Sequence, residues 1–232
     1  YFGGVLAQDG CIYFAPVNAA QILKFNVATH EISYLPKIGG TYYGGCLAQD
    51  GCIYFAPGNS TQIMKLNIAT QTTSFVGSNL SSTGDKYFGA CLGNDGCIYF
   101  APLTESKIMV LNVASQTTSF ININESSTVK FSGCSLVADN YIYFAPNGAK
   151  KTLKLNLETQ TTSFIGYDFG VANDKFVGIT PHPDGNAYYS SVIINRTVKI
   201  DKTTDKTTFM GSQFPIGYRI YFGACLGNDG CI

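Results

Sequence analysis

An eight-residue phrase recurs along this chain and restricts the folds that it can adopt. Asp-Gly-Cys-Ile-Tyr-Phe-Ala-Pro occurs unchanged at 9–16, 50–57 and 95–102, and in altered form at 139–146 and 184–191. These copies, with a sixth that is only begun, start at Asp9, Asp50, Asp95, Asp139, Asp184 and Asp229. Their separations of 41, 45, 44, 45 and 45 residues average 44. A period of this length indicates a fold assembled from one repeated supersecondary unit.

Each repeat predicts four short β-strands. In the second repeat, small residues at 43–48 lead into an Asp-Gly turn, which favours a hairpin because glycine accepts a positive φ angle. Residues 52–56 are apolar on both faces, as in a strand that is covered on both sides. Residues 64–68 alternate between apolar and polar, and after a polar turn a fourth strand carries an aromatic residue. Glycine pairs such as Gly44-Gly45 suit an innermost strand, where converging blades leave no room for side chains.

These features predict an all-β fold, a β-propeller of four-stranded antiparallel blades. A β-trefoil has too few units, a β-helix has a shorter period, and a helical solenoid would show helical periodicity. We expect a single domain, 1–232, with five blades at 1–40, 41–85, 86–129, 130–174 and 175–218 and a partial sixth at 219–232. Because inner strands need outer strands and the ring must close, we expect the chain to be a fragment of a longer propeller of six or seven blades, or to be closed by another chain in a larger assembly.

The repeat resembles the blades of NHL-type and YVTN-type β-propellers and, more distantly, kelch blades. The resemblance rests on the inner strand, the Asp-Gly turn, the Ile-Tyr-Phe-Ala-Pro strand and a strand that ends in Asn-x-Ala-Thr. It covers the whole chain, although the typical kelch tryptophan is missing because the chain contains no Trp. The fifth repeat departs most, with Tyr188-Tyr-Ser-Ser191 in place of Tyr-Phe-Ala-Pro. The resemblance implies a fold and no particular activity.

The charge balance excludes some classes of function. Fifteen basic and fifteen acidic side chains give a formal net charge of zero, whereas binding to nucleic-acid phosphates needs a basic surface. No apolar run approaches the roughly 18 residues that span a bilayer. The chain begins at Tyr1 without a signal-peptide pattern, so we expect any targeting segment to have been removed or to lie outside it.

Variable loops are the expected recognition surface. They connect the second strand of a blade to the third, and one blade to the next, and they are rich in Ser, Thr, Asn and Gly. This composition suits a protein or a glycan partner and selects neither. Three lysines precede the inner strands of successive blades, and an arginine stands one residue out of register in the next: Lys86, Lys130, Lys175 and Arg219. They predict either a cationic arc that binds an anionic group or a set of solvated surface charges.

The sequence predicts no catalytic residue, cofactor or metal site. The inner strands carry no Asp or Glu, and the repeated Asp residues fall in turns. His30 lies in a turn, and His182 lies beside a hairpin turn with no partner evident from the sequence. We therefore predict a non-enzymatic β-propeller that serves as an interaction scaffold.

Two alternative functions stay open. One is a lectin. The other is a propeller lyase or lactonase with a site at the channel mouth near His182, because virginiamycin-lyase-like propellers resemble these blades and rely on histidine. Two or more titratable side chains that converge on His182 would favour the enzyme.

The eight cysteines and four glycosylation sequons give weaker signals. Cys46 and Cys52 flank the first hairpin of the second repeat. A two-residue Asp50-Gly51 turn would send their sulfurs to opposite faces of the sheet, so we expect free thiols; a three- or five-residue loop would place them on one face. The sequons lie in or beside predicted loops, at Asn59, Asn79, Asn124 and Asn195. Sequons and low charge favour a secreted or extracellular location, which we expect, although free thiols favour the cytoplasm.

Overall fold

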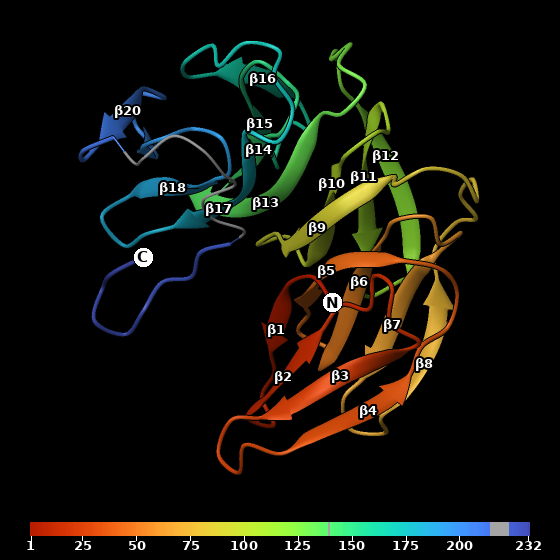
Figure 1. Cartoon of the computed structure of the whole chain (residues 1–232). Helices are drawn as coiled ribbons and strands as arrows, with labels where there is room; N and C mark the ends of the chain where they lie inside the picture. Colours follow the sequence, from red (N-terminus) through yellow and green to blue (C-terminus); the bar gives the residue numbers. More distant parts are fainter. Residues whose placement is uncertain (139, 214–222) are drawn as a thin grey trace. The chain divides into compact units, whose positions relative to one another are not determined.

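A computed structural model describes residues 1–138, 140–213 and 223–232 and contains five four-stranded antiparallel sheets (Figure 1). Within these residues there is no helix, and hence none that could cross a membrane. The chain divides into two compact units, Tyr1–Ile121 and Asn122–Ile232, each of which is described by itself. The strands pair in chain order within every sheet, so each sheet is one blade, and the predicted all-β propeller fold is confirmed.

The first unit contains three blades. Blade one consists of β1 (Gly4–Leu6), β2 (Cys11–Phe14), β3 (Gln21–Asn26) and β4 (Ile32–Pro36). Blade two consists of β5 (Tyr42–Leu47), β6 (Cys52–Pro57), β7 (Ile63–Asn67) and β8 (Thr72–Val76). Blade three consists of β9 (Tyr87–Leu92), β10 (Cys97–Pro102), β11 (Lys107–Asn112) and β12 (Thr117–Asn122).

The second unit contains two blades and a C-terminal segment. Blade four consists of β13 (Phe131–Ala138), β14 (Tyr141–Pro146), β15 (Thr152–Asn156) and β16 (Thr162–Ile165). Blade five consists of β17 (Phe176–Pro181), β18 (Asn186–Ser191), β19 (Thr197–Asp201) and β20 (Thr207–Met210). Residues 223–232 form a turn without assigned strands. In every blade, the connections between the first and second strands and between the third and fourth strands lie at one end, which we call the turn end. The connection between the second and third strands and the links to other blades lie at the opposite end, which we call the loop end.

Glycines allow the innermost strands of neighbouring blades to approach closely. In the first unit, Gly44 has a φ of 71°, and a Cβ atom there would lie 3.3 Å from the Cα atom of Gly89. In the second unit, a Cβ atom on Gly133 would lie 3.1 Å from the Cα atom of Gly178. A side chain would therefore meet the backbone of the next blade, and the left-handed φ angle is accessible to glycine without strain. This confirms the expectation from the glycine pairs.

The cores lie between consecutive blades. Tyr13 and Ile22 of blade one pack in one buried cluster with Phe55, Met64 and Leu66 of blade two. Blades two and three, and blades four and five, share equivalent clusters. In the first unit, β6 thus contributes Phe55 to the cluster with blade one and Tyr54 to the cluster with blade three. This explains why this strand is apolar on both faces.

The first hairpin of blade two differs from the predicted two-residue turn. Cys46 pairs with Tyr54, and the Ala48 N–H donates to the Cys52 carbonyl at 2.9 Å, so the loop has three residues. This register places Cys46 and Cys52 on the same face, contrary to our expectation. The two cysteines are not directly opposite each other but one pair further along the hairpin, so their Cα atoms lie about 7–8 Å apart, which is too far for a disulfide. None of the eight cysteines, all of which lie within the described residues, forms a disulfide.

Candidate functional site

The repeated turn aspartates have a structural role that must be separated from any chemistry. In blade one, the Tyr13 hydroxyl donates to Asp9 at 2.7 Å, and Lys24 forms an ion pair with Asp9 at 3.2 Å. The Gln71 amide, from blade two, donates to the Tyr13 hydroxyl at 3.1 Å. We call this set the polar clamp, because it ties one blade to the next at the turn end. The sequence predicts that these aspartates lie in turns, but it does not predict the clamp.

The polar clamp recurs with the same residue types between blades two and three. Tyr54 donates to Asp50 at 2.7 Å, Lys65 pairs with Asp50 at 3.0 Å, and Gln116 donates to Tyr54 at 2.8 Å. Burial opposes ionisation of Asp50, but hydrogen bonds from Tyr54 and Lys65 outweigh it and lower its pKa. The ionised carboxylate of Asp50 therefore has a structural role, because its hydrogen bonds and ion pair hold the junction between blades two and three.

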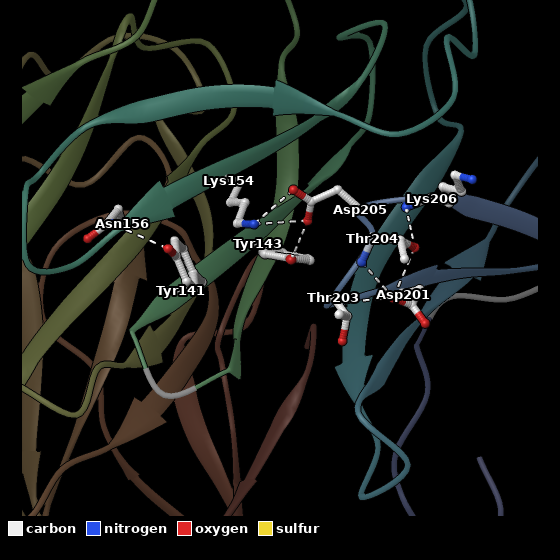
Figure 2. Close-up of polar contacts among 9 residues, drawn as sticks. All are labelled: Tyr141, Tyr143, Lys154, Asn156, Asp201, Thr203, Thr204, Asp205 and Lys206. Atoms are coloured by element: carbon white, nitrogen blue, oxygen red, sulfur yellow. Dashed lines mark hydrogen bonds and ion pairs between the residues drawn. The ribbon is translucent and has the colours of Figure 1, made fainter.

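Blades four and five use a different acid in their clamp. Figure 2 shows Tyr143 and Lys154 of blade four directed at the carboxylate of Asp205, which belongs to blade five. Lys154 contacts the two carboxylate oxygens at 2.9 and 2.8 Å, and Tyr143 donates at 2.8 Å. Asp205 has a positive φ angle, as do Gln71 and Gln116 at the equivalent turn position. The following blade therefore supplies a negative charge here in place of an amide.

Blade five carries a histidine at its first turn, where blades one and two carry Ala7 and Ala48. The His182 N–H donates to the Asn186 carbonyl, as those alanines do to the cysteines in their hairpins. The His182 Nδ1 atom lies 2.9 Å from the Asp184 carboxylate, and its Nε2 atom lies 2.8 Å from the Gly230 carbonyl oxygen. The imidazole is therefore held at both nitrogens.

Two further groups hold the Asp184 carboxylate opposite His182. The Tyr188 hydroxyl donates to it at 3.0 Å, and the Asn186 side-chain amide donates at 2.8 Å. The rings of Tyr188 and His182 meet edge to face, with centroids 5.7 Å apart. Two titratable side chains, Asp184 and Tyr188, thus converge with His182. This is the arrangement that the sequence analysis named as favouring an enzyme.

His182 borders a cavity of about 720 Å³ on blade five, which we call the His182 cavity. Blade five and the C-terminal segment line it: His182, Tyr188, Tyr189, Ser190, Thr197, Gly223, Ala224, Cys225, Gly230, Cys231 and Ile232. Its volume falls within the range of small-molecule sites, roughly 300–1,000 Å³. No Asp, Glu, Lys or Arg is among the lining residues in the described part of the chain.

The surroundings of His182 favour its protonated form. The hydrogen bond to the Gly230 carbonyl and then the Asp184 carboxylate raise the pKa of His182 above its ordinary value. Burial opposes ionisation of Asp184, but hydrogen bonds from Asn186, His182 and Tyr188 outweigh it, so the pKa of Asp184 is lowered. The Nδ1 atom also accepts a hydrogen bond from the Asp184 backbone N–H at 3.1 Å, which places the proton of the neutral ring on Nε2, within 2.8 Å of the Gly230 carbonyl oxygen.

The predicted lysine arc is not exposed. At most 6% of the surface of each lysine is exposed, at Lys86, Lys130 and Lys175. The sequence predicted exposed charges, whether as an anion-binding arc or as solvated surface residues. Arg219 lies outside the described residues. Lys175 precedes β17 and His182 follows it, so these two predicted features lie at opposite ends of one strand and do not form a common site. Partner binding by these lysines stays a prediction that their burial does not support.

Lys175 is buried with local partners, whereas the buried Lys86 Nζ atom has no hydrogen-bond partner within the described residues. The Lys175 Nζ atom donates to the carbonyls of Gly170 at 3.0 Å and Ala172 at 2.5 Å, in the connection before blade five. Burial lowers the pKa of Lys175 to about 8, although the carboxylates of Glu125 and Asp168 oppose this. Lys175 thus ties down its own connecting loop.

Replacing Lys175 by methionine is expected to change how stability depends on pH. The lowered pKa means that the folded state releases this proton at about pH 8, whereas the unfolded chain keeps it to about pH 10.4. The unfolding free energy of the wild type should therefore rise relative to Lys175→Met between these values. Urea unfolding at pH 7, 8, 9 and 10 measures the difference. A difference that is constant with pH would contradict the prediction.

The other predicted residues lie apart from the His182 cavity. All four sequons are at loop ends, where Asn59, Asn79 and Asn124 are exposed and Asn195 is half-buried, and glycosylation stays a prediction. His30 is exposed in a turn of blade one. Among the residues that the structure describes, no three His, Cys, Asp or Glu side chains are grouped so that they could hold a metal ion.

Comparison with known proteins supports the fold and does not assign a function. No protein-family model and no curated protein sequence match this chain. A streptogramin B lyase structure has a TM-score of 0.78 and 19% identity, over 92% of this chain and 68% of that one. Virginiamycin B lyase from Staphylococcus aureus has a TM-score of 0.77 and 16% identity, over 90% of this chain and 69% of that one. A Bacteroides thetaiotaomicron protein of unknown function has a TM-score of 0.67 and 15% identity, over 94% of this chain and 59% of that one.

Proposed function

We propose that the protein is an acid–base enzyme of the lyase class that acts in the His182 cavity. The observation that carries this proposal is the pairing of His182 with Asp184 at 2.9 Å beside a cavity large enough for a small molecule. A histidine whose second nitrogen is oriented by a carboxylate is a common arrangement for proton transfer. No other described histidine has such a partner, because His30 lies exposed in a turn.

Each group has a distinct role in this proposal. His182 donates the Nε2 proton to a substrate oxygen as its C–O bond breaks, and the neutral Nε2 atom then accepts the proton released from the adjacent carbon as the C=C bond forms, which restores the imidazolium. Asp184 stays ionised, fixes the ring orientation and stabilises the imidazolium. Tyr188 holds Asp184 through its hydroxyl at 3.0 Å. The substrate oxygen takes the place of the Gly230 carbonyl, which lies 2.8 Å from Nε2 in this structure.

The lyases among the similar structures support the class of reaction as a starting point. Their identity to this chain, 16–19%, is too low to transfer residues or substrates. A catalytically inactive variant of the staphylococcal virginiamycin B lyase has been solved with quinupristin, at 18% identity. We therefore take virginiamycin B and quinupristin as the first substrates to test.

The test is to incubate the purified protein with each compound and follow it by liquid chromatography and mass spectrometry. The expected result is loss of the substrate in proportion to the protein concentration, with a product of unchanged mass, because an intramolecular elimination in a ring adds no water. A product heavier by one water would indicate hydrolysis instead. Substrate loss at the rate of the buffer control would contradict a streptogramin lyase.

A protein-binding scaffold is the second candidate, and one surface of the second unit favours it. At the loop end of blade five, Val171 and Ile193 are 72% and 47% exposed, and Tyr167 in the same connection as Val171 is 54% exposed. Exposed apolar side chains on loops are typical of protein contacts. For a partner held through this surface, Val171→Asp with Ile193→Asp should abolish retention on the immobilised protein, and His182→Ala should leave it unchanged. Retention by both variants would contradict this interpretation.

A further inference from the structure

Four of the five blades carry an Asp-Gly pair in their first hairpin, at 9–10, 50–51, 95–96 and 184–185. Such a pair can rearrange without another reactant, because the glycine nitrogen can attack the side-chain carboxyl carbon of the aspartate. Glycine favours this attack because it has no side chain to obstruct the approach. The reaction needs a carboxyl group that is neutral and free to turn towards its own backbone. The contacts of each aspartate therefore decide whether its pair reacts.

A lysine holds the carboxylate in blades one and two. Lys24 pairs with Asp9 at 3.2 Å. Lys65 pairs with Asp50 at 3.0 Å. Burial opposes ionisation of Asp50, but hydrogen bonds from Tyr54 and Lys65 outweigh it, so the pKa of Asp50 is lowered. The lysine thus acts against the rearrangement in two ways, because it keeps the carboxyl group ionised and fixes its orientation.

Blade five holds its aspartate with other groups. The Asp184 carboxylate accepts hydrogen bonds from the Asn186 side chain at 2.8 Å and from the Tyr188 hydroxyl at 3.0 Å. It also lies 2.9 Å from the His182 ring. The Gly185 N–H donates to the His182 carbonyl at 3.0 Å. Both reacting groups of this pair are therefore engaged.

Blade three carries a valine at the position of the clamp lysine. The register of β10 and β11 pairs Tyr99 with Val110. The equivalent pair in blade two is Tyr54 with Lys65. Val110 is buried and has no polar side-chain atom. The polar clamp of blade three therefore has no ammonium group at this position.

The Asp95 carboxylate keeps the other contacts of the repeat. The Tyr99 hydroxyl donates to it at 2.8 Å, and the Cys97 N–H donates at 3.1 Å. The bond from Cys97 folds the side chain back over the nitrogen of Gly96, which lies between the two residues. A Cβ atom on Gly96 would meet nothing within 4 Å, so there is room for a ring to close. Asp95 is exposed, so water can reach the product.

We propose that Asp95-Gly96 is a site of spontaneous isoaspartate formation and the first of the four hairpin pairs to rearrange. The Gly96 nitrogen bonds to the Cγ atom of Asp95, and the carboxyl hydroxyl leaves as water with the amide proton, which closes a succinimide ring. Water then adds to the former main-chain carbonyl and opens the ring. The chain now runs through the Asp95 side chain, so it gains one carbon, and the mass of the protein is unchanged.

The test follows isoaspartate at each pair during incubation of the purified protein at pH 6. Trypsin places Asp95 in the peptide 87–107 and Asp50 in 38–65, whereas the Asp229-Gly230 pair of the C-terminal segment falls in 220–232 and does not enter the comparison. An isoaspartate peptide keeps its mass, elutes separately and resists cleavage by Asp-N protease. Isoaspartate is expected to form at Asp95 about tenfold faster than at Asp50, because a nearby cation lowers a carboxyl pKa by about 1 or more and thereby lowers the neutral fraction about tenfold.

Two reciprocal variants test the role of the lysine. Lys65→Val gives blade two the residue of blade three, so the rate at Asp50 should rise to that at Asp95. Val110→Lys gives blade three the residue of blade two, so the rate at Asp95 should fall to that at Asp50. Circular dichroism verifies folding, and if one variant does not fold, the other and the wild type still give the comparison.

Urea provides the control for local sequence, because Asp50 and Asp95 are both followed by Gly-Cys-Ile-Tyr. In the unfolded chain the two sites should react at equal rates. A preference for Asp95 that persists in urea would assign it to the local sequence and overturn the proposal. Equal rates at the two sites in the folded protein, or rates that neither folded variant changes, would overturn it as well.

Discussion

Replacing His182 by alanine is expected to lower turnover in the His182 cavity by about 100-fold or more. The removal of a positioned general acid typically lowers a rate by about 10²–10⁴-fold. His182→Ala removes the only lining side chain among the described residues that titrates near neutral pH in its ordinary range. The measurement is kcat for whichever of the two proposed streptogramin substrates is turned over, with binding followed separately.

The chain offers a matched control for this substitution. His30, the other histidine, is exposed in a turn of blade one, and Gln71 and Gln116 occupy the same turn position in the next two blades. His30→Gln should therefore leave both stability and kcat unchanged. Equal turnover by the wild type and His182→Ala would remove His182 from the mechanism. A loss of binding without a loss of kcat would make it a binding residue.

Replacing Phe55 by alanine is expected to cause a large loss of stability, about 3–5 kcal/mol. Phe55 is fully buried in the cluster between blades one and two, and its ring meets that of Tyr42 edge to face, with centroids 6.4 Å apart. Truncation would leave a cavity that the rigid sheets on either side cannot close. Urea unfolding followed by circular dichroism measures the change.

Phe75 is the control for Phe55, because it lies on the outermost strand of the same blade and is 41% exposed. Phe75→Ala should lower the unfolding free energy by less than about 1 kcal/mol. Losses of similar size for the two variants would show that burial between the blades does not dominate stability. Retained stability in Phe55→Ala would contradict the interpretation of the cluster as the core.

The repeat made the fold predictable from the sequence. Strand order, the close-packed inner glycines and the two-sided burial of strands such as 52–56 follow from one pattern that recurs, so an error in one copy is corrected by the others. The three-residue loop after Ala48 was missed because Asp50-Gly51 also fits a two-residue turn, and the pattern does not distinguish the two. Loop length depends on the pairing of both strands.

The candidate site was only partly predictable. His182 was identified, but its partner Asp184 was interpreted as an ordinary turn residue, which it also is. The lysines were placed on the surface because charged side chains are usually solvated, whereas carbonyls of a neighbouring loop accept the hydrogen bonds of Lys175. The signal that could have identified the pair is the position of His182, two residues before Asp184 and at a turn position where the first two repeats have alanine.

The clamp between blades four and five means that the repeats are not interchangeable, although their sequences are so alike. Lys154 and Tyr143 take their carboxylate from Asp205, whereas Lys24 takes it from within its own blade. If blade five were exchanged for a copy of blade two, Lys154 would face the amide of Gln71. Among the five blades, only blade five carries an acid at this turn position, so a repeat exchanged into its place would have to supply that carboxylate.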